Sequence, residues 1–189
     1  GLSAISDEIG PIKETNVYAD FSYTLRFANS NLAFGIKAGA TFHDASLTDL
    51  DLIDDTDPAF AENINNTYPN VGAGLLYYGD NYYIGVSVPN FLDSAHLDPD
   101  PDGREFGNEE QHYFATAGYV FQLGENVKLK PSVLVKSSFE SPASFDGNLN
   151  ALFYDRFEIG ASYRYEDAIS GLVGIRATDW LQFGFAYDN

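Results

Sequence analysis

The feature that most constrains the fold is a strict alternation of side chains on both sides of one short loop. Apolar residues occupy every second position from Val71 to Tyr77, and again from Tyr82 to Val88. Gly79, Asp80 and Asn81 separate the two runs. Because side chains of a β-strand point alternately to opposite faces, this pattern around a Gly/Asp/Asn loop predicts an antiparallel β-hairpin.

Tyrosines gather where the two arms of this hairpin meet. Tyr77, Tyr78, Tyr82 and Tyr83 flank the loop, although the turn of a soluble hairpin is normally polar and wet. Amphipathic rings are instead enriched at the headgroup level of membranes. We therefore expect these four residues, together with Trp180, to be membrane-interface anchors rather than a sugar-binding stack.

The same alternation recurs along the chain and predicts roughly eleven strands, at residues 1–5, 17–27, 32–42, 71–78, 82–88, 112–123, 127–138, 145–154, 157–165, 168–177 and 181–187. Short turns alternate with longer connections, which include residues 6–16, 44–69 and 91–111. In an up-and-down sheet every second connection lies at the same edge. Short turns at one edge and long loops at the other are typical of outer-membrane barrels, whose strands have about 9–11 residues.

Charge and composition exclude several other classes of protein. The formal net charge is -18, which argues against binding to nucleic acid. No cysteine is present, so disulfides, structural zinc sites and thiol chemistry are excluded. The chain contains no run of about eighteen apolar residues that would form a transmembrane helix.

Basic residues fall mostly inside the predicted strands, opposite the apolar face. Alternation alone does not say which face points outward, because a soluble sandwich would bury the apolar face and a membrane barrel would expose it to lipid. The charges favour the barrel, since a wet lumen accommodates them. Either they brace the wall, with Asp20 and Glu158 as partners, or they select anions in a pore. The residues expected to face the lumen are Asp20, Arg26, Lys37, Lys128, Lys130, Lys136, Glu158, Arg164 and Arg176.

Acidic residues concentrate in two of the longer connections, and one of these has the spacing of a calcium-binding loop, D-x-D-x-D-G-x5-E. Its candidate ligands are Asp98, Asp100, Asp102 and Glu109. Two prolines stiffen this segment and no helices are expected beside it, which favours a solvated acidic loop, with calcium binding as the alternative. We expect no other cofactor.

No arrangement of residues indicates catalysis. His43, His96 and His112 are too far apart in the sequence to form a metal-ligand pair. Asp93, Ser94 and His96 are neighbours, but nucleophilic catalysis needs a base that a third group orients. We therefore expect no enzymatic activity.

Several segments resemble the PorP/SprF family of outer-membrane proteins, which belong to the type IX secretion and gliding machinery of Gram-negative bacteria. The resemblance is carried by YYGDNYYIGVSVPNFL (77–92), HYFATAGYVFQLGENVKLKPSVLVK (112–136) and FEIGASYRYEDAISGLVGIRATDWLQFGFAYD (157–188), with GLSAISDEIGPIKETNVYADFSYTLRF (1–27) and DPAFAENINNTYPNVGAG (57–74) upstream. These segments follow one another in order over nearly the whole chain.

The resemblance implies a single outer-membrane barrel domain over residues 1–189 and offers no catalytic residues to transfer. Since bacterial barrels have an even number of strands, we expect further strands before Gly1 and after Asn189. The implied partners are outer-membrane lipids, periplasmic ring lipoproteins of the secretion motor, and a secreted adhesin or its C-terminal domain. A porin-like channel with a basic lumen is the alternative function.

Overall fold

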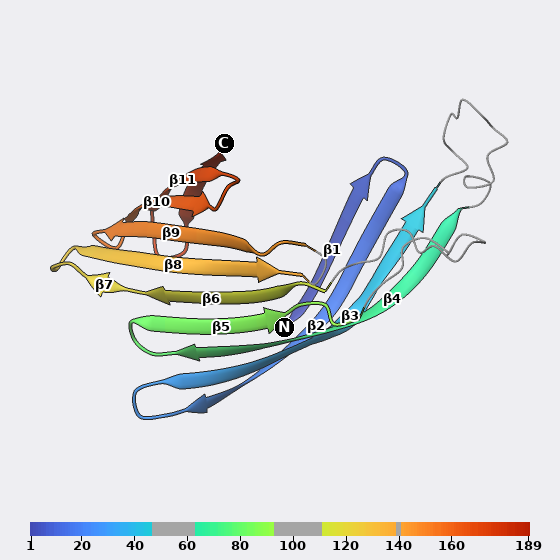
Figure 1. Cartoon of the computed structure of the whole chain (residues 1–189), viewed down its shortest axis with the longest axis horizontal. Helices are drawn as coiled ribbons and strands as arrows, with labels where there is room; N and C mark the ends of the chain where they lie inside the picture. The colour runs from blue at the N-terminus through green and yellow to red at the C-terminus, as the bar shows by residue number, and fades with distance from the viewer. Residues whose placement is uncertain (47–62, 93–110, 139–140) are drawn as a thin grey trace. The chain divides into compact units, whose positions relative to one another are not determined.

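The computed structural model describes residues 1–46, 63–92, 111–138 and 141–189 (Figure 1). Within these ranges the fold is all-β, with twelve antiparallel strands in one sheet. The strands are β1 (Leu2–Ile9), β2 (Ile12–Arg26), β3 (Asn31–Ala45), β4 (Ile64–Tyr78), β5 (Tyr82–Val88), β6 (Tyr113–Tyr119), β7 (Phe121–Gln122), β8 (Val127–Ser137), β9 (Ser144–Phe153), β10 (Phe157–Arg164), β11 (Ile169–Arg176) and β12 (Gln182–Asp188). The described residues form no helix with the length and hydropathy of a membrane span.

Strands that follow one another in the sequence are neighbours in the sheet. The order is β1-β2-β3-β4-β5-β6-β8-β9-β10-β11-β12, and the two-residue β7 pairs with β8 beside it. The path therefore contains eleven strands, as the alternation predicted. The up-and-down antiparallel topology is confirmed, because each sequence run pairs with the next through a local connection.

The chain divides into two compact units, which are described separately. The first comprises Gly1–Ser22, Gly35–Ala73 and Val88–Gln111. It contains β1, the part of β2 that follows the turn after β1, and the parts of β3 and β4 that adjoin the connection between those two strands. The second comprises Tyr23–Phe34, Gly74–Ser87 and His112–Asn189, and contains β6 to β12 with the remaining parts of β2 to β5.

Most of the short turns lie along one edge of the second unit, but residues 165–168, which join β10 and β11, form a short turn at the opposite edge. Backbone hydrogen bonds link neighbouring strands at this edge: Val120 N, between β6 and β7, donates to Asn81 O at 2.7 Å, and Tyr154 N donates to Asn126 O at 2.7 Å. These contacts follow from the meander, in which every second connection returns to the same edge.

The first connection differs from the prediction. Residues 6–16, expected to form a loop, belong to β1 and β2, and only Gly10 and Pro11 join the two strands. Gly10 has a φ of 59°, a left-handed conformation that suits glycine. One face pairs Glu8 with Lys13 and Ser6 with Thr15, and the other mixes Asp7 and Glu14 with Ile9 opposite Ile12, so no clean apolar alternation marked this hairpin. The predicted alternation of long and short connections is therefore wrong at this point.

The predicted loop at 44–69 is wrong at both of its ends. Strand β3 continues to Ala45 and β4 begins at Ile64, so β2, β3 and β4 each contain 15 residues. The Asn65 amide donates to Asp44 Oδ1 at 2.5 Å, which links the two extensions. Residues 47–62 lie outside the described ranges.

Exposure is reversed relative to a soluble sheet. Along β3, the apolar Phe34, Ile36 and Phe42 are exposed, whereas Lys37 is half-buried and Thr41 is buried. Across the described residues the only buried apolar side chain is Ala45. Soluble domains bury large apolar side chains and rarely expose wide apolar surfaces. The sheet therefore has an exposed apolar face and a more sheltered polar face.

Candidate functional site

The polar face of the second unit contains a cavity of about 240 Å³ between β8 and β12. The strand register builds it, because directly opposed residues of an antiparallel pair lie on the same face. Lys130 is opposite Asn150, and Glu158 lies between Leu152 on β9 and Gly174 on β11. The polar residues that line the cavity are Lys128, Lys130, Asn150, Arg156, Glu158, Arg176 and Gln182.

The charges of this cavity are only partly paired. Lys128 Nζ lies 2.5 Å from Asp155 Oδ1, and the Asn150 amide donates to Glu158 Oε1 at 2.7 Å. Within the described part of the chain, Lys130, Arg156 and Arg176 form no salt bridge. The cavity therefore carries an excess of positive charge.

A second charged group lies on the polar face of β9 and β10, away from this cavity. Arg164 Nε lies 2.7 Å from Asp146 Oδ1 in the opposing strand, and its Nη1 lies 3.2 Å from Asp167 Oδ2. Arg164 is thus held between two carboxylates, as expected of a bracing residue. The bracing partners predicted from the sequence were Asp20 and Glu158, but neither pairs with a cation among the residues described.

Three other residues predicted to face the lumen lie apart from one another. Lys136 is on β8 opposite Ser144, Arg26 ends β2 and is exposed, and Asp20 accepts a hydrogen bond from the Gly1 amino group through its backbone oxygen. These three positions do not form a common site.

A polar network in the first unit surrounds Lys37. Its ammonium lies 4.1 Å from the centroid of the Tyr18 ring and donates to Asn90 Oδ1 at 3.4 Å. Thr41 Oγ1 donates to Asn16 Oδ1 at 2.5 Å and lies 3.1 Å from the Tyr18 hydroxyl oxygen. A Cβ at Gly39 would overlap the Val17 carbonyl and the Tyr18 side chain, so glycine is required for this approach.

The tyrosines of the central hairpin divide between the two faces. The rings of Tyr77 and Tyr82 are 5.8 Å apart and their hydroxyl oxygens 3.4 Å apart. Strand alternation places Tyr78 and Tyr83 on the opposite face. Tyr83 lies against Gly118, where a Cβ would be 2.5 Å from its ring. Trp180 is 83% exposed. The interface role of all five aromatics stays a prediction.

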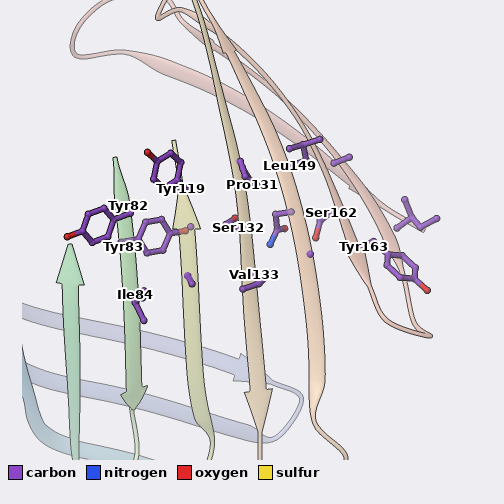
Figure 2. Close-up of a pocket in the computed structure, with 16 residues that line it drawn as sticks. Tyr82, Tyr83, Ile84, Tyr119, Pro131, Ser132, Val133, Leu149, Ser162 and Tyr163 are labelled. Atoms are coloured by element: carbon purple, nitrogen blue, oxygen red, sulfur yellow. The ribbon is translucent and has the colours of Figure 1, made fainter. Parts of the chain in front are cut away.

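The apolar face of the second unit is hollowed into a groove of about 920 Å³ (Figure 2). Figure 2 shows Tyr82 and Tyr119 toward one side and Tyr163 toward the other, with Val133 and Leu149 between them. Smaller lining residues, among them Ala117, Gly147 and Ala161, create the hollow. The groove is a feature of the exposed apolar surface rather than a catalytic pocket.

The calcium candidates Asp98, Asp100, Asp102 and Glu109 lie outside the described residues. Among the residues that are described, no group of three or more His, Cys, Asp or Glu side chains is arranged to hold a metal ion. Calcium binding therefore stays a prediction.

Comparison with protein families decides the identity. Residues 1–189 match the family described as type IX secretion system membrane protein PorP/SprF. The chain belongs to the PorP/SprF family. It is a membrane component of the type IX secretion system, and the resemblance inferred from the sequence is confirmed. No curated protein and no solved structure gives a significant match.

In this PorP/SprF protein, the sequence analysis missed three of the polar residues that line the cavity. Asn150 and Gln182 are uncharged, and Arg156 belongs to a turn rather than a strand. Arg156 could have been found from its place in the turn after β9, because turns at one edge of a meander adjoin the strand ends beside them. No pattern in the sequence singled out the two amides.

Proposed function

We propose that this chain is part of an outer-membrane β-barrel that docks other components of the type IX secretion system and performs no chemistry. The observation that carries the proposal is the reversed exposure of the sheet. A barrel in a bilayer presents its apolar face to lipid and its polar face to a lumen. Closure of the barrel follows from the same argument, because unpaired backbone groups in hydrocarbon are costly.

Exposure along β10 supports this orientation residue by residue. Ile159 and Tyr163 are exposed, whereas Glu158 and Ser162 on the opposite face are half-buried. Lipid contact would remove the exposed side chains from water, and burial of one large apolar side chain contributes about 1.5–3 kcal/mol. The charged residues predicted for the lumen then line the interior, where Arg164 and Lys128 with their carboxylate partners brace the wall.

The two edges of the sheet would serve different partners. The edge of short turns, including Gly79–Asn81 and Gly124–Asn126, would face the periplasm and the ring lipoproteins of the secretion motor. The opposite edge bears the acidic connections at 46–63 and 93–110 and would face the exported adhesin or its C-terminal domain. Charged loops on a rigid scaffold are common binding sites. A strand of 15 residues extends for about 50 Å, longer than a tilted strand needs to cross a bilayer, so β2 to β4 would project beyond it.

Co-purification tests the docking role. The tagged protein, extracted from outer membranes in mild detergent, should recover periplasmic ring lipoproteins or a surface adhesin. A barrel that is normally folded, as shown by its heat-modifiable migration on gels, yet recovers neither partner would contradict the proposal.

A porin-like channel is the second candidate, and the unpaired Lys130, Arg156 and Arg176 favour it. Rings or clusters of basic side chains select anions in pores. Steady, anion-selective conductance across planar bilayers would support the channel, whereas a docking barrel should be silent.

A further inference from the structure

The cavity on the polar face between β8 and β12 has open space where the strand register would otherwise place side chains. Gly174 and Gly184 are directly opposite one another, and neither contributes a side chain. Asn150 occupies the space above Gly160, since a Cβ there would lie 2.8 Å from Asn150 Oδ1. The result is a hollow of about 240 Å³, large enough for a small polar group and its hydration.

The charges around this hollow are mostly positive, although the chain as a whole is acidic. The whole chain carries a net charge of -18, yet four of its 10 basic residues line this one cavity. Lys128 is paired with Asp155, and the other three cations have no ion-pair partner in the described ranges. Charged side chains that are clustered without counterions repel one another, and a bound anion relieves that repulsion.

Glu158 is the carboxylate of this cavity, and its position is fixed. The Asn150 amide holds Glu158 Oε1 at 2.7 Å, and no described cation pairs with it. The carboxylate therefore leaves the cations available and sets a negative charge against any anion that enters. A ligand that neutralised Glu158 would have to be a cation, and the surrounding basic side chains would repel it.

The geometry points to a binding site for a carboxylate or phosphate group, held by Lys130, Arg156 and Arg176 and opposed by Glu158. Guanidinium groups bind both anions through paired N–H donors, and a lysine ammonium adds a compact charge. Two sources have this chemistry: a free small anion in the lumen, and an acidic segment of a partner protein. The first source rests on the barrel proposed above, whereas the site itself depends only on the cavity and its charges and not on the secretion role.

Calorimetric titration of the full chain, folded in detergent micelles, tests the site with two probes: inorganic phosphate and a tetraglutamate peptide. Lys130→Gln should weaken binding about tenfold, the effect of losing one charge-assisted hydrogen bond. Lys136→Gln is the matched control, because it removes the same charge from the same strand outside the cavity. Glu158→Gln should tighten binding several-fold, an effect that a purely bracing Glu158 would not produce.

The outcomes separate the sources and can overturn the site. Saturable binding of phosphate alone supports a free small anion, and tighter binding of the peptide supports an acidic partner segment, provided that the variants behave as stated. Absence of binding by both probes at millimolar concentration would overturn the proposal. Equal weakening by Lys130→Gln and Lys136→Gln would also overturn it, because the attraction would then belong to the whole face. Heat-modifiable migration of each variant establishes that it is folded.

Discussion

Glu158 and Ile159 are neighbours in β10, yet the carboxylate is half-buried and the apolar side chain is 54% exposed. Adjacent residues of a strand point to opposite faces, so this pair gives the polarity of each face directly. The same contrast between an exposed apolar residue and a half-buried polar neighbour occurs in β9, where Leu149 is exposed and Asn150 is half-buried. A sheet of this kind is stable only when another apolar medium covers its exposed face.

Substitution by arginine on the two faces of β10 should have unequal effects. Ile159→Arg should destabilise the protein in bilayers by about 2–4 kcal/mol, the cost of a charge facing lipid near the midplane. Ser162→Arg, three residues away on the polar face, should be milder because that face is wet. Both effects can be measured by adding urea to each variant in lipid vesicles and following the fraction of protein that remains folded. Phe21→Arg and Ser22→Arg form an equivalent pair on β2, and equal damage within either pair would contradict the assignment of the faces.

The two-residue turn between β1 and β2 makes a second prediction. Gly10 has a positive φ, so Gly10→Ala should destabilise the hairpin by about 1–2 kcal/mol although the added methyl meets nothing within 4 Å. Gly10→Asn should cost less, because asparagine tolerates this conformation. Gly147→Ala is the control, since Gly147 also has open space but no positive φ. The urea concentration at the unfolding midpoint would distinguish the three variants. Identical midpoints would mean that residues 6–16 behave as a loop.

The sequence predicted the strands whose two faces differ in hydropathy and missed those whose faces are alike. Phe34 to Phe42 alternate with glycine and polar residues, and β3 was found. Ser6 and Thr15, whose hydroxyl oxygens are 3.3 Å apart, lie in a hairpin whose other face mixes carboxylates with isoleucines, and it was assigned to a loop. Pro69 interrupted the pattern of β4, although the exposure of its residues alternates without a break from Ile64 to Ala73.

The polar cavity was only partly predictable for a different reason. Lys128, Lys130, Glu158 and Arg176 were expected on one face, but alternation does not state which residues of different strands are opposed. The register brings Lys130 beside Asn150 and Glu158 beside Gly174. A slip of one residue in any pair would move these side chains to the other face, so the cavity required the structure.

Labelling from outside the cell would test the assignment of the edges. The chain has no cysteine, so single cysteines can be introduced without removing others. Those in the short turns should be shielded from a membrane-impermeant reagent on intact cells, and those in the long connections should react. The shielded positions are Asn29, Asp80, Glu125 and Asp179, and the reactive ones are Asp55 and Asp102. Mixed reactivity within either group would contradict the proposed orientation.

Calcium binding by the loop at 98–109 can be tested on the full chain by calorimetry. If the carboxylates converge on one ion, Asp100→Asn should weaken calcium binding at least about tenfold, because it removes a charged ligand from the centre of the loop. Asp55→Asn removes the same charge from the other acidic connection and should have little effect. Equal and small effects of the two substitutions would indicate diffuse attraction by acidic loops rather than a site.

Shortening the connection at 93–110 separates docking from barrel assembly. This connection carries seven acidic residues at the edge proposed to face the exported adhesin. Its removal should abolish recovery of the surface partner while the barrel still folds, since strands β5 and β6 pair through their own register from Tyr82↔Tyr119 to Ser87↔Phe114. If the acidic loops only keep the protein soluble through charge repulsion, shortening this connection would leave recovery of the surface partner unchanged. Shortening the connection at 138–143, at the same edge but with one acidic residue, is the control for loop length. Pull-down yield beside a heat-modifiability gel decides the question, and normal recovery of the partner by a normally folded variant would overturn the docking role of this edge.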